Sequence, residues 1–91
     1  MDKPIEVGTV VFSIMGRDSG RFYIVTEITN DRYVKIADGD LRRIDKPKPK
    51  KIKHLKSQGE ILPKIAEKLL EGKKIFDAEL KAALKSYNGS L

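Results

Sequence analysis

The sequence predicts a small, mostly β fold in which a compact barrel is followed by a C-terminal helical hairpin. The chain has 91 residues, which is enough for one small domain. Short runs of alternating apolar and polar residues fill its first half, and after residue 57 the apolar residues recur with the period of a helix. We therefore expect the barrel within residues 1–56 and the helical extension within residues 57–91.

Four strands are predicted between residues 9 and 44. Their alternating patterns are rich in β-branched and aromatic side chains, as is typical of strands. Asp38-Gly39 separates the last two and suits the type I′ turn of a two-residue hairpin, in which both residues have positive φ. The predicted strands are 9–14, 22–28, 33–37 and 41–44. Closing them into a barrel would leave few exposed edges.

The aromatic residues of these strands fall on two predicted faces. Phe12 and Phe22 are in phase with the apolar face of their strands, so we expect them in the core. Tyr23 and Tyr33 fall on or near the outer face. There a tyrosine is either half-buried against the barrel or available to stack on an unpaired base.

The stretch "DKPKPKKIKHLK" is expected to be an edge or a free extended arm. Pro47 and Pro49 cannot donate hydrogen bonds to a neighbouring strand and favour extended conformations in the residues before them. Ile52 and Leu55 are suited to anchor the end of the arm on the barrel as a fifth strand. The basic arm, which we take as residues 42–56, then leaves Lys51, Lys53 and His54 facing outward.

Two short amphipathic helices are predicted in the C-terminal part. The first spans about 62–71, with Pro63 in its first turn and Gly72 at its C-terminal end. Asp77 is the expected N-cap of the second, and Gly89 ends it. Neither short helix is stable without burying its apolar face, so the hairpin must pack on the barrel, on itself or on a partner.

Positive charge is concentrated in the middle of the chain. The 19 Lys and Arg against 13 Asp and Glu give a net charge of +6, and eight of the basic residues lie between Arg42 and Lys56 with Asp45 as the only acid. Such a stripe favours a polyanion, because each neutralised phosphate releases a condensed counterion. The alternative is a lysine-rich, solvated linker.

Several function classes have little support in the sequence. There is no cysteine, and His54 is the only histidine, so neither a zinc site nor a hydrolytic triad is expected. We expect no catalytic residue, no metal and no cofactor. No apolar run reaches the roughly 20 residues that span a bilayer, and the lack of cysteine fits a reducing compartment. The expected location is the cytoplasm, without membrane contact.

The loop Gly16-Arg17-Asp18-Ser19-Gly20-Arg21 connects the first two predicted strands. Its glycines permit positive φ, and its arginines offer planar forks that match phosphate geometry. Two interpretations stay open on local chemistry alone. Either the loop contacts a phosphate backbone, or the glycines merely close a hairpin while Asp18 pairs with Arg17 or Arg21.

The stretches "VGTVVFSIMGRDSGRFYIVTEI" and "DRYVKIADGDLRRIDKPKPKKIKHL" resemble the KOW motif. More closely, they resemble bacterial KOW-domain RNA-binding proteins related to the large-subunit ribosomal protein family 14e of archaea and eukaryotes. The resemblance covers residues 7–55. It implies an SH3-like barrel and a non-catalytic role in binding RNA, often ribosomal RNA, and it does not extend to the helices.

The leading hypothesis is therefore a non-catalytic RNA-binding protein that binds ribosomal RNA or the ribosome through phosphate contacts, and the alternative is a protein-interaction adaptor. The adaptor would use the SH3-like barrel or the C-terminal helices, which are a candidate surface for a protein partner. The expected RNA-binding residues are Gly16, Arg17, Ser19, Gly20, Arg21, Arg42, Arg43, Lys46, Lys48, Lys50, Lys51, Lys53, His54 and Lys56.

Overall fold

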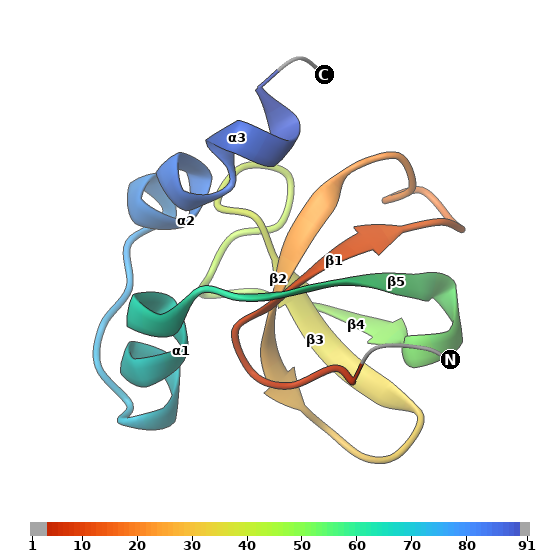
Figure 1. The fold of residues 1–91 in the computed structure, drawn as a ribbon, viewed down its shortest axis with the longest axis horizontal. Coiled ribbons are helices and arrows are strands. Elements are labelled where there is room, and N and C mark those ends of the chain that lie inside the picture. The colour runs from red at the N-terminus through yellow and green to blue at the C-terminus, as the bar shows by residue number, and fades with distance from the viewer. Residues whose placement is uncertain (1–3, 90–91) are drawn as a thin grey trace.

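A computed structural model describes residues 4–89 of the chain, and in this range five strands are followed by three short α-helices. Figure 1 shows the strongly twisted sheet on one side and the helices gathered on the other. A 3₁₀ turn, η1, joins the fourth and fifth strands. The elements are β1 Thr9–Ser13, β2 Phe22–Ile28, β3 Tyr33–Ala37, β4 Lys48–Lys51, η1 Ile52–His54, β5 Leu55–Ile61, α1 Pro63–Leu70, α2 Asp77–Ala83 and α3 Lys85–Asn88. The fold class, mostly β with C-terminal helices, is thus confirmed.

The strands form one antiparallel sheet in the order β4-β3-β2-β1-β5. The predicted strand at 41–44 was wrong, because this segment belongs to the loop between β3 and β4. Asp38 does not have positive φ, so the turn there is not type I′. Instead, the Asp38 carboxylate accepts hydrogen bonds from the backbone N–H groups of Asp40 and Arg42 at 3.0 and 2.8 Å, which shapes a wider loop.

The proline-containing segment forms the edge strand β4 and not a free arm. Its residues 48–51 pair with β3, and Pro49 is tolerated because β4 has a neighbour on one side only. The fifth strand is longer than predicted. It continues past the expected boundary at 56/57 to Ile61, so the sheet extends into the part of the sequence that was assigned to the helices.

The sheet is buried on both faces. One face carries a cluster of residues from β1, β2, β3 and β5, against which Ile5 and Ile52 pack. The prediction for Tyr23 was wrong, since this residue is fully buried in that cluster. The sequence alone could not predict this burial. Both faces of β2 carry apolar side chains, and alternation does not indicate which segments pack against each face. The members of this cluster are Val11, Tyr23, Val25, Val34, Ile36 and Leu55.

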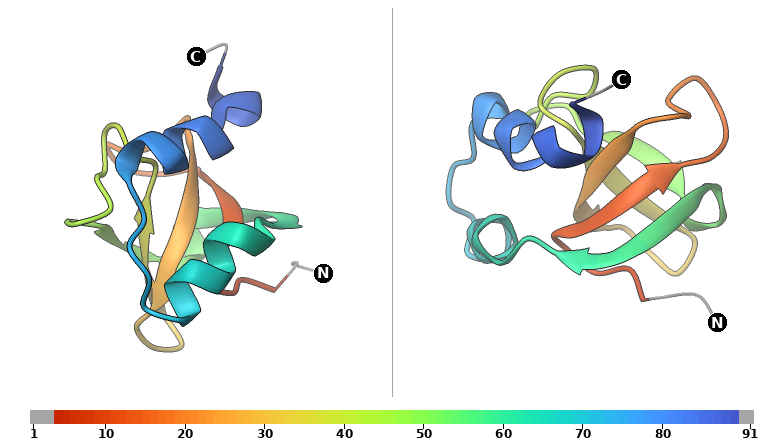
Figure 2. Two further views of the ribbon diagram at one scale, coloured as in Figure 1. Left: turned by 90° about the vertical axis from the view of Figure 1, so that its left-hand side faces the viewer. Right: turned by 45° about the horizontal axis from the view of Figure 1, so that its top comes forward.

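The helices cover the opposite face. Figure 2 shows α1 and α2 beside the sheet, and the second core cluster combines Val10 and Ile24 of the strands with Leu80 and Leu84 of the helical part. Phe22 lies against this cluster and also contacts the rings of Phe12 and Tyr87, at centroid distances of 4.8 and 5.1 Å. Phe22 thus packs against the core while half-buried. Phe12 is also half-buried and belongs to neither core cluster, so the expectation that it lies in the core was wrong.

The first helix agrees with the prediction, and the second does not. Pro63 is the first residue of α1, and Gly72 follows its end with φ of 70°. The predicted second helix is broken at Leu84 into α2 and α3. Asp77 is not a side-chain cap for its own helix, because its carboxylate accepts hydrogen bonds from Ile44 N–H at 2.7 Å and Arg43 Nε at 3.3 Å. That contact fixes the start of α2 to the loop between β3 and β4.

Candidate functional site

The loop between β1 and β2 contains the two glycines that the sequence singled out. Gly16 and Gly20 have φ of 88° and 85°, a conformation that favours glycine. Gly20 N–H donates to Ser13 O at 2.9 Å, which closes the loop on the end of β1. A Cβ atom at Gly16 would lie 2.7 Å from Lys50 Nζ, so this glycine also leaves room for the Lys50 side chain.

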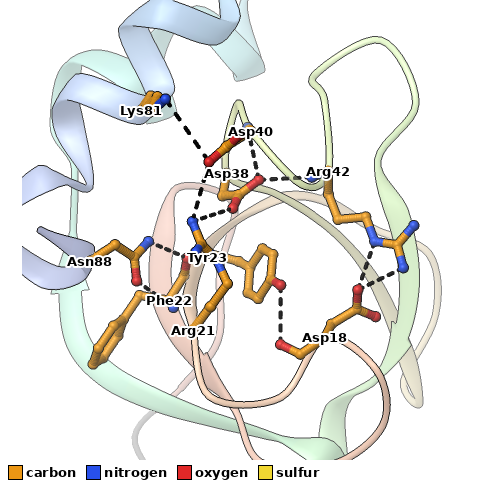
Figure 3. A network of polar contacts seen from close by, with 9 residues as sticks. All are labelled: Asp18, Arg21, Phe22, Tyr23, Asp38, Asp40, Arg42, Lys81 and Asn88. Carbon is orange, nitrogen blue, oxygen red and sulfur yellow. Dashed lines mark hydrogen bonds and ion pairs between the residues drawn. The ribbon is translucent and has the colours of Figure 1, made fainter. Parts of the chain in front are cut away.

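Asp18 is the centre of the polar contacts in this loop. Its side chain is only 5% exposed, and its Oδ1 accepts a hydrogen bond from Arg42 Nε at 2.7 Å and forms an ion pair with Arg42 Nη2, also at 2.7 Å (Figure 3). Lys50 Nζ lies 3.7 Å from Asp18 Oδ2 and donates to Met15 O at 2.6 Å. Asp18 therefore pairs with residues far away in the sequence and not with Arg17 or Arg21.

Tyr23 makes a buried contact with the same loop. Its hydroxyl donates to Asp18 O at 3.1 Å inside the core (Figure 3). Burial raises the pKa of Tyr23 to about 12, and the charges of Asp18 and Asp38 add to the effect. The ionised phenolate is thus strongly disfavoured in the folded protein.

Arg21 is held in a second network. Its Nη2 lies 3.3 Å from Asp38 Oδ2 and 3.7 Å from Asp40 Oδ2, and Lys81 Nζ of α2 approaches Asp40 at 4.0 Å (Figure 3). The Nε of Arg21 is buried without a hydrogen-bond partner in the described residues. Beside this network, Asn88 of α3 exchanges two hydrogen bonds of 2.9 Å with the backbone of Phe22.

These contacts divide the expected RNA-binding residues into two groups. Arg21, Arg42 and Lys50 take part in the fold through partly or fully buried ion pairs, and Arg43 is 70% exposed but faces Asp77 at 3.3 Å. The remaining cations have no carboxylate of residues 4–89 within ion-pair distance. They are Arg17, Lys46, Lys48, Lys51, Lys53 and Lys56.

The exposure of these residues supports the same division. Gly16, Arg17, Ser19 and Gly20 are exposed at the tip of the loop. Lys46, Lys51, Lys53 and Lys56 are also exposed, Lys48 is half-buried, and Lys50 is buried. Among the expected RNA-binding residues, the accessible positive charge apart from the loop tip lies at Lys46 and along β4, η1 and the start of β5.

His54 is poorly suited to act as a cation here. Desolvation is the main cause that lowers the pKa of His54, and the positive charges of Lys50, Lys53 and Lys51 lower it further. The imidazole is therefore less protonated near neutral pH than an ordinary histidine. A neutral imidazole can still donate one hydrogen bond to a phosphate oxygen.

An open hollow of about 1090 Å³ lies beside the accessible lysines. Lys51, Lys53 and Lys56 line it, together with apolar side chains from several segments. The backbone N–H of Ile52 donates to Arg32 O at 2.8 Å and thereby ties η1 to the start of β3. The apolar and aromatic lining residues are Ile5, Ile14, Tyr33, Ile52 and Leu55.

Sequence reasoning missed Arg32, Ile5 and Ile14 as members of this hollow. Tyr33 was named as a possible stacking surface, and Ile52 and Leu55 only as anchors of the arm. Asn30-Asp31 reads as a turn, and Arg32 follows it directly. The register of β3 on β4 pairs Tyr33 with Lys51, which brings the turn beside the basic segment. The basic-aromatic pattern of Arg32-Tyr33 was the signal available, but only the pairing of the strands shows which lysines it joins.

No helix in the part of the chain that the structure describes is long and apolar enough to cross a membrane. Within residues 4–89, no group of three or more His, Asp or Glu side chains is arranged to hold a metal ion. Comparison with protein-family models and with curated proteins finds no match to this chain.

Proposed function

We propose that the chain is a non-catalytic RNA-binding protein, with an SH3-like barrel of the KOW type, that grips the phosphates of structured RNA in the cytoplasm. The proposed target is ribosomal RNA or the large ribosomal subunit. The resemblance to the KOW-domain proteins related to family 14e supports this choice of target. The binding surface consists of the tip of the β1–β2 loop and the basic segment from β4 to the start of β5.

The observation that carries the proposal is the position of the cations without ion pairs. Lys51, Lys53 and Lys56 are exposed along one segment and have no carboxylate of the described residues to neutralise them. A phosphate backbone is the partner whose regular negative charge fits such a segment, and its counterions are released on binding. Exposed, flexible lysines contact phosphates without reading base sequence.

The arginine network gives the loop its shape, so Arg17 is the cation we assign to the RNA at this end of the site. Arg17 is exposed, and its neighbour Asp18 is already occupied by Arg42 and Lys50. Gly16 and Gly20 expose the backbone on either side of it. In this proposal Arg21, Arg42 and Lys50 hold the loop in place, and Arg17 makes the contact.

The test is RNA affinity as a function of salt, measured with fragments of ribosomal RNA and by cosedimentation with ribosomal subunits. The triple variant Lys51→Gln, Lys53→Gln, Lys56→Gln is expected to weaken binding and to reduce the slope of log affinity against log salt by about 1 per lysine. The matched control is Lys64→Gln, Lys74→Gln, Lys85→Gln, which removes three exposed lysines of the C-terminal part that make no ion pair in residues 4–89. Equal affinity of the triple variant and the parent protein would overturn the proposal.

A protein-interaction adaptor is the second candidate, and one observation favours it. Leu70 at the end of α1 is 73% exposed, and Phe76 just before α2 is 61% exposed, although apolar side chains of this size are more often covered. Both lie in the C-terminal helical part. If this were the functional surface, Leu70→Ser would abolish partner capture, while the lysine triple variant would leave it intact.

A further inference from the structure

We propose that the hollow between β4, η1, β5 and the start of β3 binds an unpaired RNA strand, with Tyr33 as the platform on which a base stacks. This inference rests on the proposed RNA-binding function and specifies which form of RNA the site takes. It assigns the lysines to the phosphates and the apolar lining to the bases.

Tyr33 has no evident part in the core. It is half-buried and lines the hollow, and it belongs to neither of the two core clusters. Its hydroxyl makes no hydrogen bond within residues 4–89, unlike that of Tyr23. Its backbone is held independently of its ring, because Tyr33 N–H donates to Asn30 Oδ1 at 2.8 Å. The ring is therefore free to act as a binding surface.

The charge around Tyr33 suits a polyanion. Lys51 is its direct partner across the β3–β4 ladder, and Arg32 precedes it in the chain. Lys53 and Lys56 line the same hollow, where Asp31 is the only acid among the lining residues that the structure describes. An aromatic ring with lysines and an arginine around it is the arrangement used to bind single-stranded nucleic acid, in which bases stack and cations follow the backbone.

The apolar lining distinguishes an unpaired strand from a duplex. Ile5, Ile14 and Ile52 line the hollow beside the cations. An A-form duplex presents phosphates and sugars at its surface and keeps its bases stacked inside, so it has nothing to offer these side chains. Unstacked bases have apolar faces, so packing them against these isoleucines removes apolar surface from water.

The shape of the hollow agrees with an extended strand. Its volume of about 1090 Å³ is at the upper end of the roughly 300–1,000 Å³ of ligand pockets, but it does not enclose its contents as those pockets do. It is also open, and segments distant in the sequence line it, from Ile5 to Gln58. An extended chain that enters and leaves suits this shape.

The experiment uses the full chain and three RNA probes at about 50 mM salt. The probes are an oligouridine of about eight nucleotides, an oligomer of the same length without bases, and a perfect duplex with a matched number of phosphates. Fluorescence anisotropy gives the affinity of the parent, Tyr33→Ala, Tyr33→Phe and the control Phe76→Ala for each probe. Phe76 is an exposed aromatic residue that does not line the hollow.

The expected result is a loss confined to one probe. Tyr33→Ala should weaken oligouridine binding by about 5- to 100-fold, since one base then loses its stacking partner. It should leave the base-free oligomer and the duplex unchanged, and Tyr33→Phe should retain the parent affinity. Phe76→Ala should match the parent on all three probes.

Three outcomes would count against the inference, and they can be told apart. If Tyr33→Ala binds oligouridine as the parent does, the stacking site is wrong while RNA binding stands. If polyglutamate displaces oligouridine as readily as unlabelled oligouridine does, the hollow is a general polyanion site. If the parent binds none of the three probes, the proposed function itself fails.

Discussion

The β1–β2 loop and the basic segment 46–56 are both rich in positive charge, but the structure uses that charge in opposite ways. At the loop, Arg42 and one member of the basic segment, Lys50, converge on the buried carboxylate of Asp18, and Arg21 is held by Asp38. In the rest of the basic segment, Lys51, Lys53 and Lys56 are exposed with no carboxylate partner in the described residues. Basic residues in a sequence are thus not equally available to a partner.

The reason for the difference is the distribution of acids. Asp18, Asp38 and Asp40 lie on loops that the sheet brings together, and each takes up a nearby cation. Asp45 is the only acid between Arg42 and Lys56, and it makes no ion pair in residues 4–89. The loop region is consequently expected to respond to mutation through stability, and the basic segment through binding.

The largest expected effect is the loss of Asp18. Asp18→Ala leaves Arg42 and the buried Lys50 without their carboxylate, and breaking such a pair from one side costs about 3–5 kcal/mol of unfolding free energy. Urea unfolding measures the change, with the exposed Asp45→Ala as control. Asp18→Asn, which keeps the shape, should lose less than Asp18→Ala. An unfolding free energy equal to that of the Asp45 control would show that the network is not structural.

The raised pKa of Tyr23 predicts that the folded protein loses stability at high pH. The pKa is about 10 in the unfolded chain and about 12 in the folded protein, so the folded state holds the proton more tightly. This contribution is complete below pH 10 and is lost as the pH rises toward 12, which lowers the free energy of unfolding by about 2–3 kcal/mol.

The measurement for Tyr23 is the difference between the parent and Tyr23→Phe, because lysines also titrate in this range. At neutral pH, Tyr23→Phe should cost about 1 kcal/mol for the hydrogen bond to Asp18 O. The difference should shrink as the pH rises above 10, and the two curves should cross before pH 12, because the loss of about 2–3 kcal/mol in the parent exceeds the neutral-pH difference. Parallel curves would mean that the phenol titrates normally in the folded state.

The basic segment should show the opposite behaviour. The Lys51, Lys53, Lys56 triple glutamine variant is expected to lose roughly 10- to 100-fold in RNA affinity at low salt. Its unfolding free energy should stay within about 0.5 kcal/mol per substitution of the parent value, because these side chains are exposed. A variant that unfolds more easily yet binds RNA normally would reverse the comparison between the two regions.

Arg17 and Arg21 allow the smallest and sharpest comparison, because they lie in one loop. Arg21→Ala should lower the unfolding free energy by about 1–2 kcal/mol, since the nearly buried Asp38 loses a charged hydrogen-bond donor. Arg17→Ala should leave stability unchanged within about 0.5 kcal/mol and reduce the salt slope of RNA binding by about 1. Thermal unfolding and anisotropy on the same samples measure both effects. If Arg17→Ala and Arg21→Ala changed stability and RNA binding equally, the assignment of Arg17 to RNA contact and Arg21 to the fold would be wrong.

Local patterns predicted the elements whose signal does not depend on distant partners. The strands β1, β2 and β3 follow from alternation, and α1 follows from its apolar stripe, Pro63 and Gly72. The strand at 41–44 was wrong because the Asp38 side chain satisfies backbone N–H groups that a hairpin would have used. The prediction of one continuous second helix was wrong, because the helix is broken at Leu84 although no glycine or proline lies there.

The candidate site was predictable as a region but not as a set of contacts. The concentration of lysines between residues 46 and 56 was visible, and so was the glycine-arginine loop. Which cations are occupied depends on carboxylates between 17 and 34 positions away, such as Asp18 for Arg42 and Asp77 for Arg43. No local pattern reveals such pairs, because strand order and helix packing create them.

The sequence by itself determined the fold class, the excess of positive charge and its location in the middle of the chain. These properties depend on composition and on short-range periodicity, which need no knowledge of distant contacts. The tertiary structure alone decided that Tyr23 is buried while Tyr33 lines a hollow, and that Arg42 is paired while Lys53 is not. The physical reason is that the availability of a side chain depends on what packs against it, and here its neighbours come from other strands and loops.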